Sequence, residues 1–302
     1  MEKRSILHMI DPMPHNSAFD INMAVDAGFD MIFTHHNVKL EEVGGMVQDA
    51  IFSRGPTGVT RTALFIGGRD LGLAMSMIDA AKKAMVPPFQ TSAFADPSGA
   101  FTTAAALVAG VEKQLKEKHG TELAGKNAIV FGGTGPVGVA TGVIASLVGA
   151  RVTIVDPFSI DTALEKANEY NKLCGSTLRG TYASSDADKA RLIRNADVVF
   201  CAAKAGIQVL TASVLEDATC LKVAGDVNAV PPLGIEGIKL KDNGAPLLLA
   251  TNSPGAVGIG ALAVGDYKYK LQHVLLKALL QEHAEPVFYD FREAFRVARE
   301  IV

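Results

Sequence analysis

Hydrophobic and polar positions follow two alternating patterns along the first third of the chain. Short apolar runs of strand character are separated by longer segments in which apolar residues recur every three or four positions. The strand-like runs are RSILHMI, FDMIFTHHNV and RTALFIGG, and the helix-like segments are SAFDINMAVDAG, LEEVGGMVQDAIFSR and DLGLAMSMIDAAKKAMV. Glycines and Pro87-Pro88 stop several of them. This alternation predicts a mostly parallel sheet covered by helices.

The remainder of the chain repeats the same architecture. AAALVAGVEKQLKEKHG predicts a long helix that bridges two domains, and NAIVFGG, ARVTIVDP, ADVVFCAAK and CLKVAGDV predict four strands with helices between them. The tail from Tyr267 reads as helical. We therefore expect an α/β protein with an N-terminal α/β substrate domain (1–118) and a Rossmann-type doubly wound parallel sheet (119–260). The C-terminal helices (261–302) are expected to pack back on the substrate domain.

Composition narrows the class of protein. With 302 residues, 48% hydrophobic and 20% charged, the chain is typical of a globular protein that can form two cores. A net charge of −3 and a pI near 6.2 argue against nucleic acid as a partner. No apolar run reaches the length of a membrane span, and the N-terminal run is broken by Asp11 and Pro12, unlike a secretory signal. The high hydrophobic content also suggests a subunit interface, and hence a homo-oligomer.

The cysteines and histidines predict neither disulfides nor a metal. Three cysteines stand at wide spacing with no CxxC pair, which fits a reducing cytoplasm. The adjacent His35 and His36 would point to opposite faces of a strand, so they make a poor metal clamp.

One glycine-rich segment has the pattern of a phosphate-binding turn. A buried-type strand leads into GxGxxG, and a helix of small residues follows. The pattern consists of Gly133, Thr134, Gly135, Pro136, Val137 and Gly138. Gly133 permits the tight turn, Gly135 lets the backbone approach a pyrophosphate, and Gly138 allows close helix–strand packing. The helix N-terminus would then face the phosphates of a dinucleotide.

The next strand predicts which dinucleotide is bound. It ends at Asp156, about twenty residues on, where a carboxylate accepts hydrogen bonds from the adenosine ribose. A carboxylate there repels a 2′-phosphate, so we expect NAD as coenzyme, with NADP as a second possibility. The alternative is that Asp156 only caps a turn with Pro157.

Loops after the third and fourth strands of this sheet are expected to enclose the nicotinamide and its ribose. The candidate contacts are Ala203 and Lys204 in CAAKAG, and Asp226 and Asn228 in GDVNAVPP. Lys204 could equally face solvent.

Four segments resemble one known family: DPSGAFTTAAALVAGVEK, GGTGPVGVATGVIASLVGA, GDVNAVPPLGIEGI and GALAVGDYKYKLQHVLLKAL. Together with FDINMAVDAGFDMI, they are similar to methylene-tetrahydromethanopterin dehydrogenases of bacterial one-carbon metabolism, over essentially the full length and in matching order. The resemblance implies hydride transfer from the methylene carbon of the reduced pterin to a nicotinamide. It favours the form that accepts NAD as well as NADP, because the strictly NADP-linked form has a basic residue after the second strand. Such chemistry needs positioning rather than a general base.

The resemblance also implies a role for Lys268. It matches a lysine important for activity in the family's GGLKLK-like segment, although Asp266 and Tyr267 differ from that pattern. We expect Lys268 either to orient the pterin or to be held neutral by desolvation, the alternative being a solvated lysine at the start of a helix. Lys270 would point in a different direction.

The substrate cleft is expected at the carboxyl ends of the second domain's strands, facing the first domain. The candidate substrate contacts are Phe19, Asp20, Ser98, Phe101 and Thr102. Either phenylalanine could stack on the pterin or belong to the core, and Thr102 could be a helix cap. Three other functions remain open at this point: a methylene-tetrahydrofolate dehydrogenase, a non-catalytic NAD-binding sensor, and an additional methenyl cyclohydrolase activity.

Overall fold

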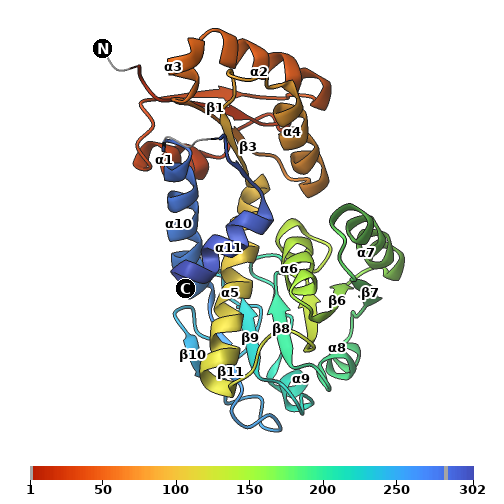
Figure 1. Cartoon of the computed structure of the whole chain (residues 1–302). Coiled ribbons are helices and arrows are strands. Elements are labelled where there is room, and N and C mark those ends of the chain that lie inside the picture. Colours follow the sequence, from red (N-terminus) through yellow and green to blue (C-terminus); the bar gives the residue numbers. More distant parts are fainter. Residues whose placement is uncertain (1–2, 282–284) are drawn as a thin grey trace. The chain divides into compact units, whose positions relative to one another are not determined.

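The computed structural model describes residues 3–281 and 285–302, and these form two compact units. Unit 1 comprises Met1–Thr102 and Tyr269–Val297, and unit 2 comprises Thr103–Lys268 and Ala298–Val302. Each unit is built around its own sheet, and parallel strands separated by helices confirm the predicted α/β class (Figure 1).

Unit 1 contains a five-stranded parallel sheet in the order β12-β4-β3-β1-β2. Its strands are β1 (Ile6–Ile10), β2 (Met31–His35), β3 (Thr62–Ile66), β4 (Ser92–Ala95) and β12 (Phe288–Tyr289). The all-apolar interior of β3 is buried throughout, as expected for a central strand with both faces covered.

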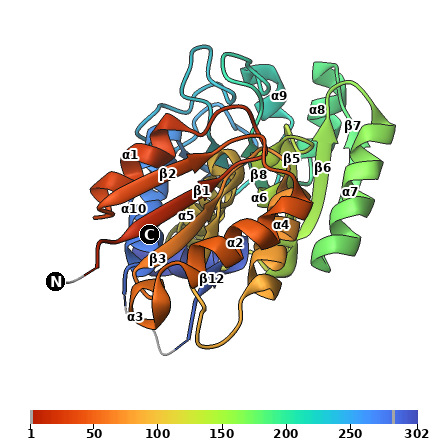
Figure 2. The same ribbon diagram turned by 90° about the horizontal axis from the view of Figure 1, so that it is seen from above.

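Helices α2 and α4 lie along one face of this sheet, and α1 lies on the other (Figures 1 and 2). The helical elements of unit 1 are α1 (Ala18–Asp26), η1 (Leu40–Glu42), α2 (Val43–Phe52), α3 (Gly55–Val59), α4 (Leu71–Ala84) and η2 (Pro97–Gly99). Polar side chains cap the N-termini of two of these helices. Ser17 accepts the Asp20 N–H at 3.3 Å, and Asp70 accepts the Leu73 N–H at 2.7 Å. Helices α5 (Ala100–His119), α10 (Ala261–Ala278) and α11 (Phe291–Ile301) each contain a boundary between the units.

Unit 2 contains a seven-stranded sheet in the order β10-β11-β9-β8-β5-β6-β7. The strands are β5 (Asn127–Phe131), β6 (Arg151–Asp156), β7 (Arg179–Tyr182), β8 (Val198–Cys201), β9 (Val223–Asp226), β10 (Asn243–Pro246) and β11 (Val257–Ile259). All neighbouring pairs are parallel except β10 and β11. The chain runs outward from β5 to β7 and then crosses to β8, so the strand order reverses at β5, where doubly wound sheets bind ligands.

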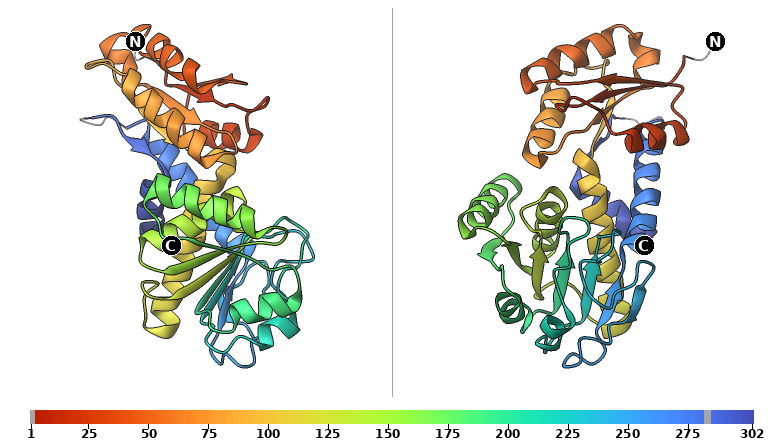
Figure 3. Two further views of the ribbon diagram at one scale, coloured as in Figure 1. Left: turned by 90° about the vertical axis from the view of Figure 1, so that its right-hand side faces the viewer. Right: turned by 180° about the vertical axis from the view of Figure 1, so that it is seen from behind.

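Helices cover both faces of this sheet (Figure 3). They are α6 (Pro136–Leu147), α7 (Ile160–Cys174), α8 (Asp186–Ile193) and α9 (Ala212–Glu216), together with most of α5. One apolar core joins Val199 and Ile129 of the sheet to Ile193 of α8 and Leu215 of α9.

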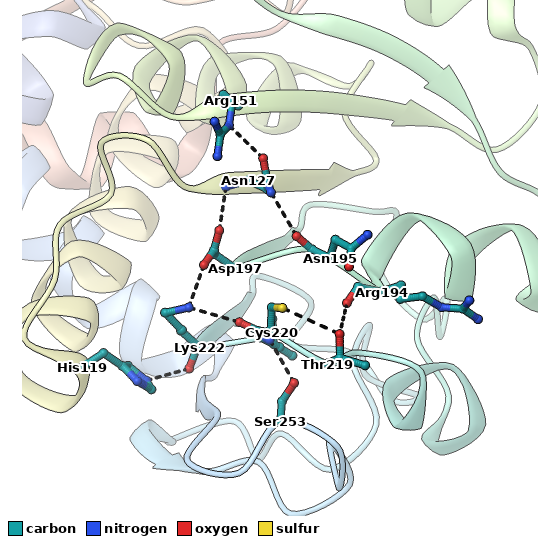
Figure 4. Close-up of polar contacts among 11 residues, drawn as sticks. His119, Asn127, Arg151, Arg194, Asn195, Asp197, Thr219, Cys220, Lys222 and Ser253 are labelled. Atoms are coloured by element: carbon teal, nitrogen blue, oxygen red, sulfur yellow. Dashed lines mark hydrogen bonds and ion pairs between the residues drawn. The ribbon is translucent and has the colours of Figure 1, made fainter.

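Polar contacts join the amino ends of four strands in unit 2 (Figure 4). The Asp197 carboxylate accepts the Asn127 N–H at 3.0 Å and the Lys222 ammonium at 2.7 Å, and Asn127 accepts from Arg151 at 2.9 Å. Burial alone would raise the pKa of Asp197, but the hydrogen bonds from Lys222 and Asn127 lower it below its usual value. This network joins the amino ends of the strands, whereas the glycine-rich loop follows the carboxyl end of β5.

The structure corrects several predicted elements. The segment LEEVGGMVQDAIFSR is not one helix but η1 followed by α2, and α10 begins at Ala261, before Tyr267. Strands β4, β7, β10, β11 and β12, of two to four residues each, were not predicted.

Candidate functional site

The glycine-rich loop leaves β5 and enters α6 in a tight turn. Gly132 has φ +68°, a left-handed conformation, and the Gly133 N–H donates to Val155 O of the neighbouring strand at 3.1 Å. Gly135 is the N-cap of α6 and Pro136 is its first residue, where a missing N–H costs nothing. The helix therefore presents its free amides and positive dipole end at the strand-order reversal, which is an arrangement suited to an anion.

Three of the glycines are required by contacts within the protein. A Cβ on Gly133 would lie 2.6 Å from Ile154 Cβ, and a Cβ on Gly138 would overlap Gly132 O. A Cβ on Gly132, which the sequence reasoning did not single out, would lie 2.6 Å from the Ala203 nitrogen. The only signal for Gly132 was the doubled glycine after the strand.

Gly135 differs from these three because the protein itself leaves space beside it. The nearest atom to a Cβ there would be Gly132 O at 3.5 Å, an ordinary contact. A glycine that the fold does not require, at the N-terminus of α6, is consistent with close approach of a ligand. The protein's own atoms therefore do not fill the position of a Cβ at Gly135.

Asp156, at the end of β6, is almost fully buried and already has internal partners. Its Oδ1 accepts the N–H groups of Phe158 and Ser159 at 2.8 and 2.9 Å, and its Oδ2 accepts the Thr134 hydroxyl at 2.6 Å. Burial raises the pKa of Asp156, but these three donors outweigh burial and lower the pKa below its usual value. Asp156 therefore caps the β6–α7 turn and also contacts the glycine-rich loop.

The loops after β8 and β9 are joined through the side chains of Asp226 and Asn228, both buried. Asn228 accepts the Gly206 N–H at 3.1 Å, which connects the two loops, and donates to Pro232 O at 3.0 Å. Asp226 accepts the N–H groups of Asn228 and Ile235 at 2.9 and 3.0 Å.

Through these contacts, both side chains stabilise the conformation of the loops. Burial raises the pKa of Asp226 above its usual value despite its backbone donors. Ala203 is half-buried. Lys204 is exposed, so its charged side chain is accessible in the loop that follows β8.

In unit 1, three of the predicted substrate residues have structural partners. Phe101 is fully buried and packs edge-on against Phe291. Thr102 is also fully buried, and its hydroxyl donates to Asp96 at 2.6 Å. Asp20 is buried and accepts from the Gln272 amide at 2.6 Å. The packing of Phe101 favours the core alternative for that residue. Thr102 is not the helix cap, because it lies inside α5 and the Asp96 carboxylate accepts the N–H groups of Phe101 and Thr102.

The other two predicted substrate residues are less tightly enclosed. Phe19 lies on α1 with 48% of its surface exposed. Ser98 follows β4 with φ +53° and is exposed, and its hydroxyl donates to Gly68 O at 3.0 Å. A non-glycine residue in this conformation is strained, and such strain is often found at functional sites. Asp96, which the sequence reasoning missed, supports this turn by accepting the Phe101 N–H at 2.9 Å.

Lys268 lies well inside α10 and is partly buried, whereas Lys270 is exposed. Lys268 is therefore not at the start of a helix, because α10 begins at Ala261. Over the described ranges, no three His, Cys, Asp or Glu side chains are grouped to hold a metal ion. Within the same residues, no helix combines the length and apolar character of a membrane span.

Comparison with known proteins places the chain in a family. Residues 18–98 match the family model described as methylene-tetrahydromethanopterin dehydrogenase, N-terminal. The chain is 44% identical to the NAD(P)-dependent methylenetetrahydromethanopterin dehydrogenase of Methylorubrum extorquens, over 99% of both chains. It is 33% identical to the bifunctional protein MdtA of the same organism, again over 99% of both.

Solved structures confirm the fold. Shikimate 5-dehydrogenase from Listeria monocytogenes, in complex with shikimate and NAD, superposes with a TM-score of 0.54 at 14% identity, over 97% of this chain and 96% of that one. The ligand-free 5-ketofructose reductase of Gluconobacter sp. strain CHM43 gives 0.50 at 16% identity, over 99% of both chains. The full-length match at 44% identity, together with the matching N-terminal family model, shows that this chain belongs to the methylene-tetrahydromethanopterin dehydrogenase family.

Proposed function

We propose that this protein oxidises methylene-tetrahydromethanopterin by transferring a hydride from its methylene carbon to NAD(P)+, which yields the methenyl product. The observation that supports this most is 44% identity over 99% of the chain to a dehydrogenase named for that substrate. The site geometry agrees, since the open position at Gly135 and the N-terminus of α6 suit a dinucleotide pyrophosphate.

The residues of the chain would act mainly by positioning. The bound nicotinamide supplies the hydride acceptor, so the protein needs to orient two ligands and exclude water. We assign the pyrophosphate to the loop from Gly133 to Gly138 and the adenosine ribose to Asp156. We assign the pterin to Lys268, Phe19 and Ser98, with Asp20 as a further contact. Phe101 and Thr102 would act indirectly, by packing the start of α5.

We further propose NAD as the preferred coenzyme and NADP as a second one, with no metal required. The proposed division is a substrate domain in residues 1–118, a coenzyme domain in 119–260 and C-terminal helices in 261–302. A cytoplasmic homo-oligomer fits the cysteine usage and the hydrophobic content.

A spectrophotometric assay tests the proposal. Purified protein is given methylene-tetrahydromethanopterin or methylene-tetrahydrofolate, each with NAD or NADP, and nicotinamide reduction is followed. Reduction with the methanopterin substrate supports the proposal. Reduction with the folate substrate alone would favour the folate dehydrogenase, and coenzyme binding without reduction of any pairing would favour a sensor.

A further inference from the structure

The hydrogen bond between Thr134 and Asp156 joins the phosphate-binding loop to the end of the neighbouring strand. Thr134 lies between Gly133 and Gly135, and its hydroxyl donates to Asp156 Oδ2 at 2.6 Å. The GxGxxG pattern does not require a hydroxyl at this position, because it specifies only the glycines and leaves the residues between them variable. The contact is therefore a feature of this chain's own side chains.

Counting acceptor sites shows what this contact does to the carboxylate. An ionised carboxylate has about four lone-pair sites, two on each oxygen. Oδ1 already accepts two backbone N–H groups, from Phe158 and Ser159, and Oδ2 accepts the Thr134 hydroxyl. One site on Oδ2 is left for a ligand, so Asp156 can accept one ribose hydroxyl rather than two.

The same three donors offset the negative charge of the carboxylate. A carboxylate at this place favours NAD because it accepts from the 2′-hydroxyl and repels a 2′-phosphate. Two of the donors are backbone amides that the turn itself supplies, and no side-chain substitution removes them. The Thr134 hydroxyl is the one donor of the three that comes from a side chain, and it contacts the only oxygen that has a free site.

We propose that Thr134 is a positioning residue that sets coenzyme preference through Asp156. By occupying Oδ2 and offsetting its charge, the hydroxyl weakens the discrimination of Asp156 against a 2′-phosphate, which allows NADP to bind as well as NAD. This inference rests on the proposed use of a nicotinamide dinucleotide and adds a residue that controls which one is bound.

The test measures dissociation constants of NADH and NADPH by nicotinamide fluorescence, without substrate. Thr134→Val keeps the branched side chain but removes the hydroxyl. We expect the ratio of the NADPH constant to the NADH constant to rise about tenfold, the size of one hydrogen bond to a charged group. Thr141→Val is the matched control, since the Thr141 hydroxyl is buried in α6 without a hydrogen-bond partner among the described residues. It should leave the ratio unchanged.

A double-mutant cycle separates action through Asp156 from a general loosening of the loop. In an Asp156→Asn background, Thr134→Val should change the ratio less than twofold, because the charge that the hydroxyl offsets is gone. A coenzyme-free readout accompanies it: by carbon-13 NMR, Thr134→Val should raise the pKa of Asp156, which loses a donor.

The possible results distinguish the inference from the function beneath it. The role of Thr134 is refuted if Thr134→Val weakens both coenzymes equally, lowers the ratio, or has the same effect in the Asp156→Asn background as in the unmodified protein. In each of these cases the dehydrogenase assignment stands. If the unmodified protein binds neither coenzyme, the proposed function itself fails.

Discussion

Lys268 shows what burial within a helix adds to a residue assigned by resemblance. The sequence places a lysine in the family's motif, but only the structure shows that it lies well inside α10 and is partly buried. Its neighbour Lys270 is two positions on and exposed, so the two side chains leave the helix in different directions. They make a matched pair for mutagenesis.

We expect Lys268→Ala to lower kcat at least tenfold, because a ligand that is held less accurately reaches the reactive geometry less often. The dissociation constant of NADH should stay within twofold, since the coenzyme loop is intact. Lys270→Ala is the control and should keep near-normal turnover. Steady-state kinetics and fluorescence titration provide both readouts, and near-normal turnover of Lys268→Ala would remove this residue from the site.

At the scale of elements, the β5–loop–α6 unit could be predicted closely from sequence because its rules are local. Glycines, a buried strand and a helix of small residues specify the turn within about twelve positions. The start of α5 could not be predicted in this way. Phe101 and Thr102 look like ligand contacts in the sequence, but Phe291 and Asp96 bury them, and Phe291 is distant along the chain. Short edge strands such as β12 form only because an existing sheet accepts them.

The glycine-rich loop predicts two different responses to the same substitution. Gly138→Ala should destabilise the protein by about 1–3 kcal/mol, because the added methyl group overlaps Gly132 O and forces the backbone to move. Gly135→Ala should leave the free energy of unfolding nearly unchanged, because there is space for a Cβ. It should nevertheless raise the dissociation constant of NADH about tenfold or more by blocking approach to the pyrophosphate.

Urea unfolding and coenzyme titration of both variants check this contrast. A Gly135→Ala protein that binds NADH normally would place the pyrophosphate elsewhere. Equal losses of stability in the two variants would mean that the loop packs differently from the structure described.

At the scale of the whole molecule, the sequence could specify two α/β units but not which buried groups titrate. His8 illustrates this. It lies on β1 at a cavity of about 420 Å³ that is also lined by His35, Arg54 and Asp49. Its Nδ1 is 3.1 Å from His35 Nε2. His35 lies on β2, Asp49 lies on α2 and Arg54 follows that helix. These neighbours are distant from His8 along the chain, so no local pattern in the sequence reveals them.

Burial, with smaller effects from His35 and Arg54, lowers the pKa of His8 to about 4. The unfolded chain has a His8 pKa near 6.5, so between pH 6.5 and 4 it binds more protons than the folded protein. Stability therefore falls as pH drops through this range, by about 3 kcal/mol at most. Asp290 has the opposite effect, because burial raises its pKa to about 6 and its protonation favours the folded protein. The pH dependence of the whole chain is a sum of such opposing contributions, and only a difference between variants isolates one of them.

His8→Leu supplies that difference, since leucine fits an apolar sheet face and does not titrate. We expect the free energy of unfolding to fall less between about pH 7 and pH 4.5 in His8→Leu than in the unmodified protein, by about 1–3 kcal/mol. Urea unfolding at several pH values measures it, and His15→Leu, at an exposed position, is the matched control. Comparing slopes rather than absolute stabilities removes any change in packing that the leucine causes at all pH values. Parallel curves for His8→Leu and the unmodified protein would mean that His8 takes up protons equally in the folded and unfolded chains, and that the cavity beside it is wet enough to solvate its charge.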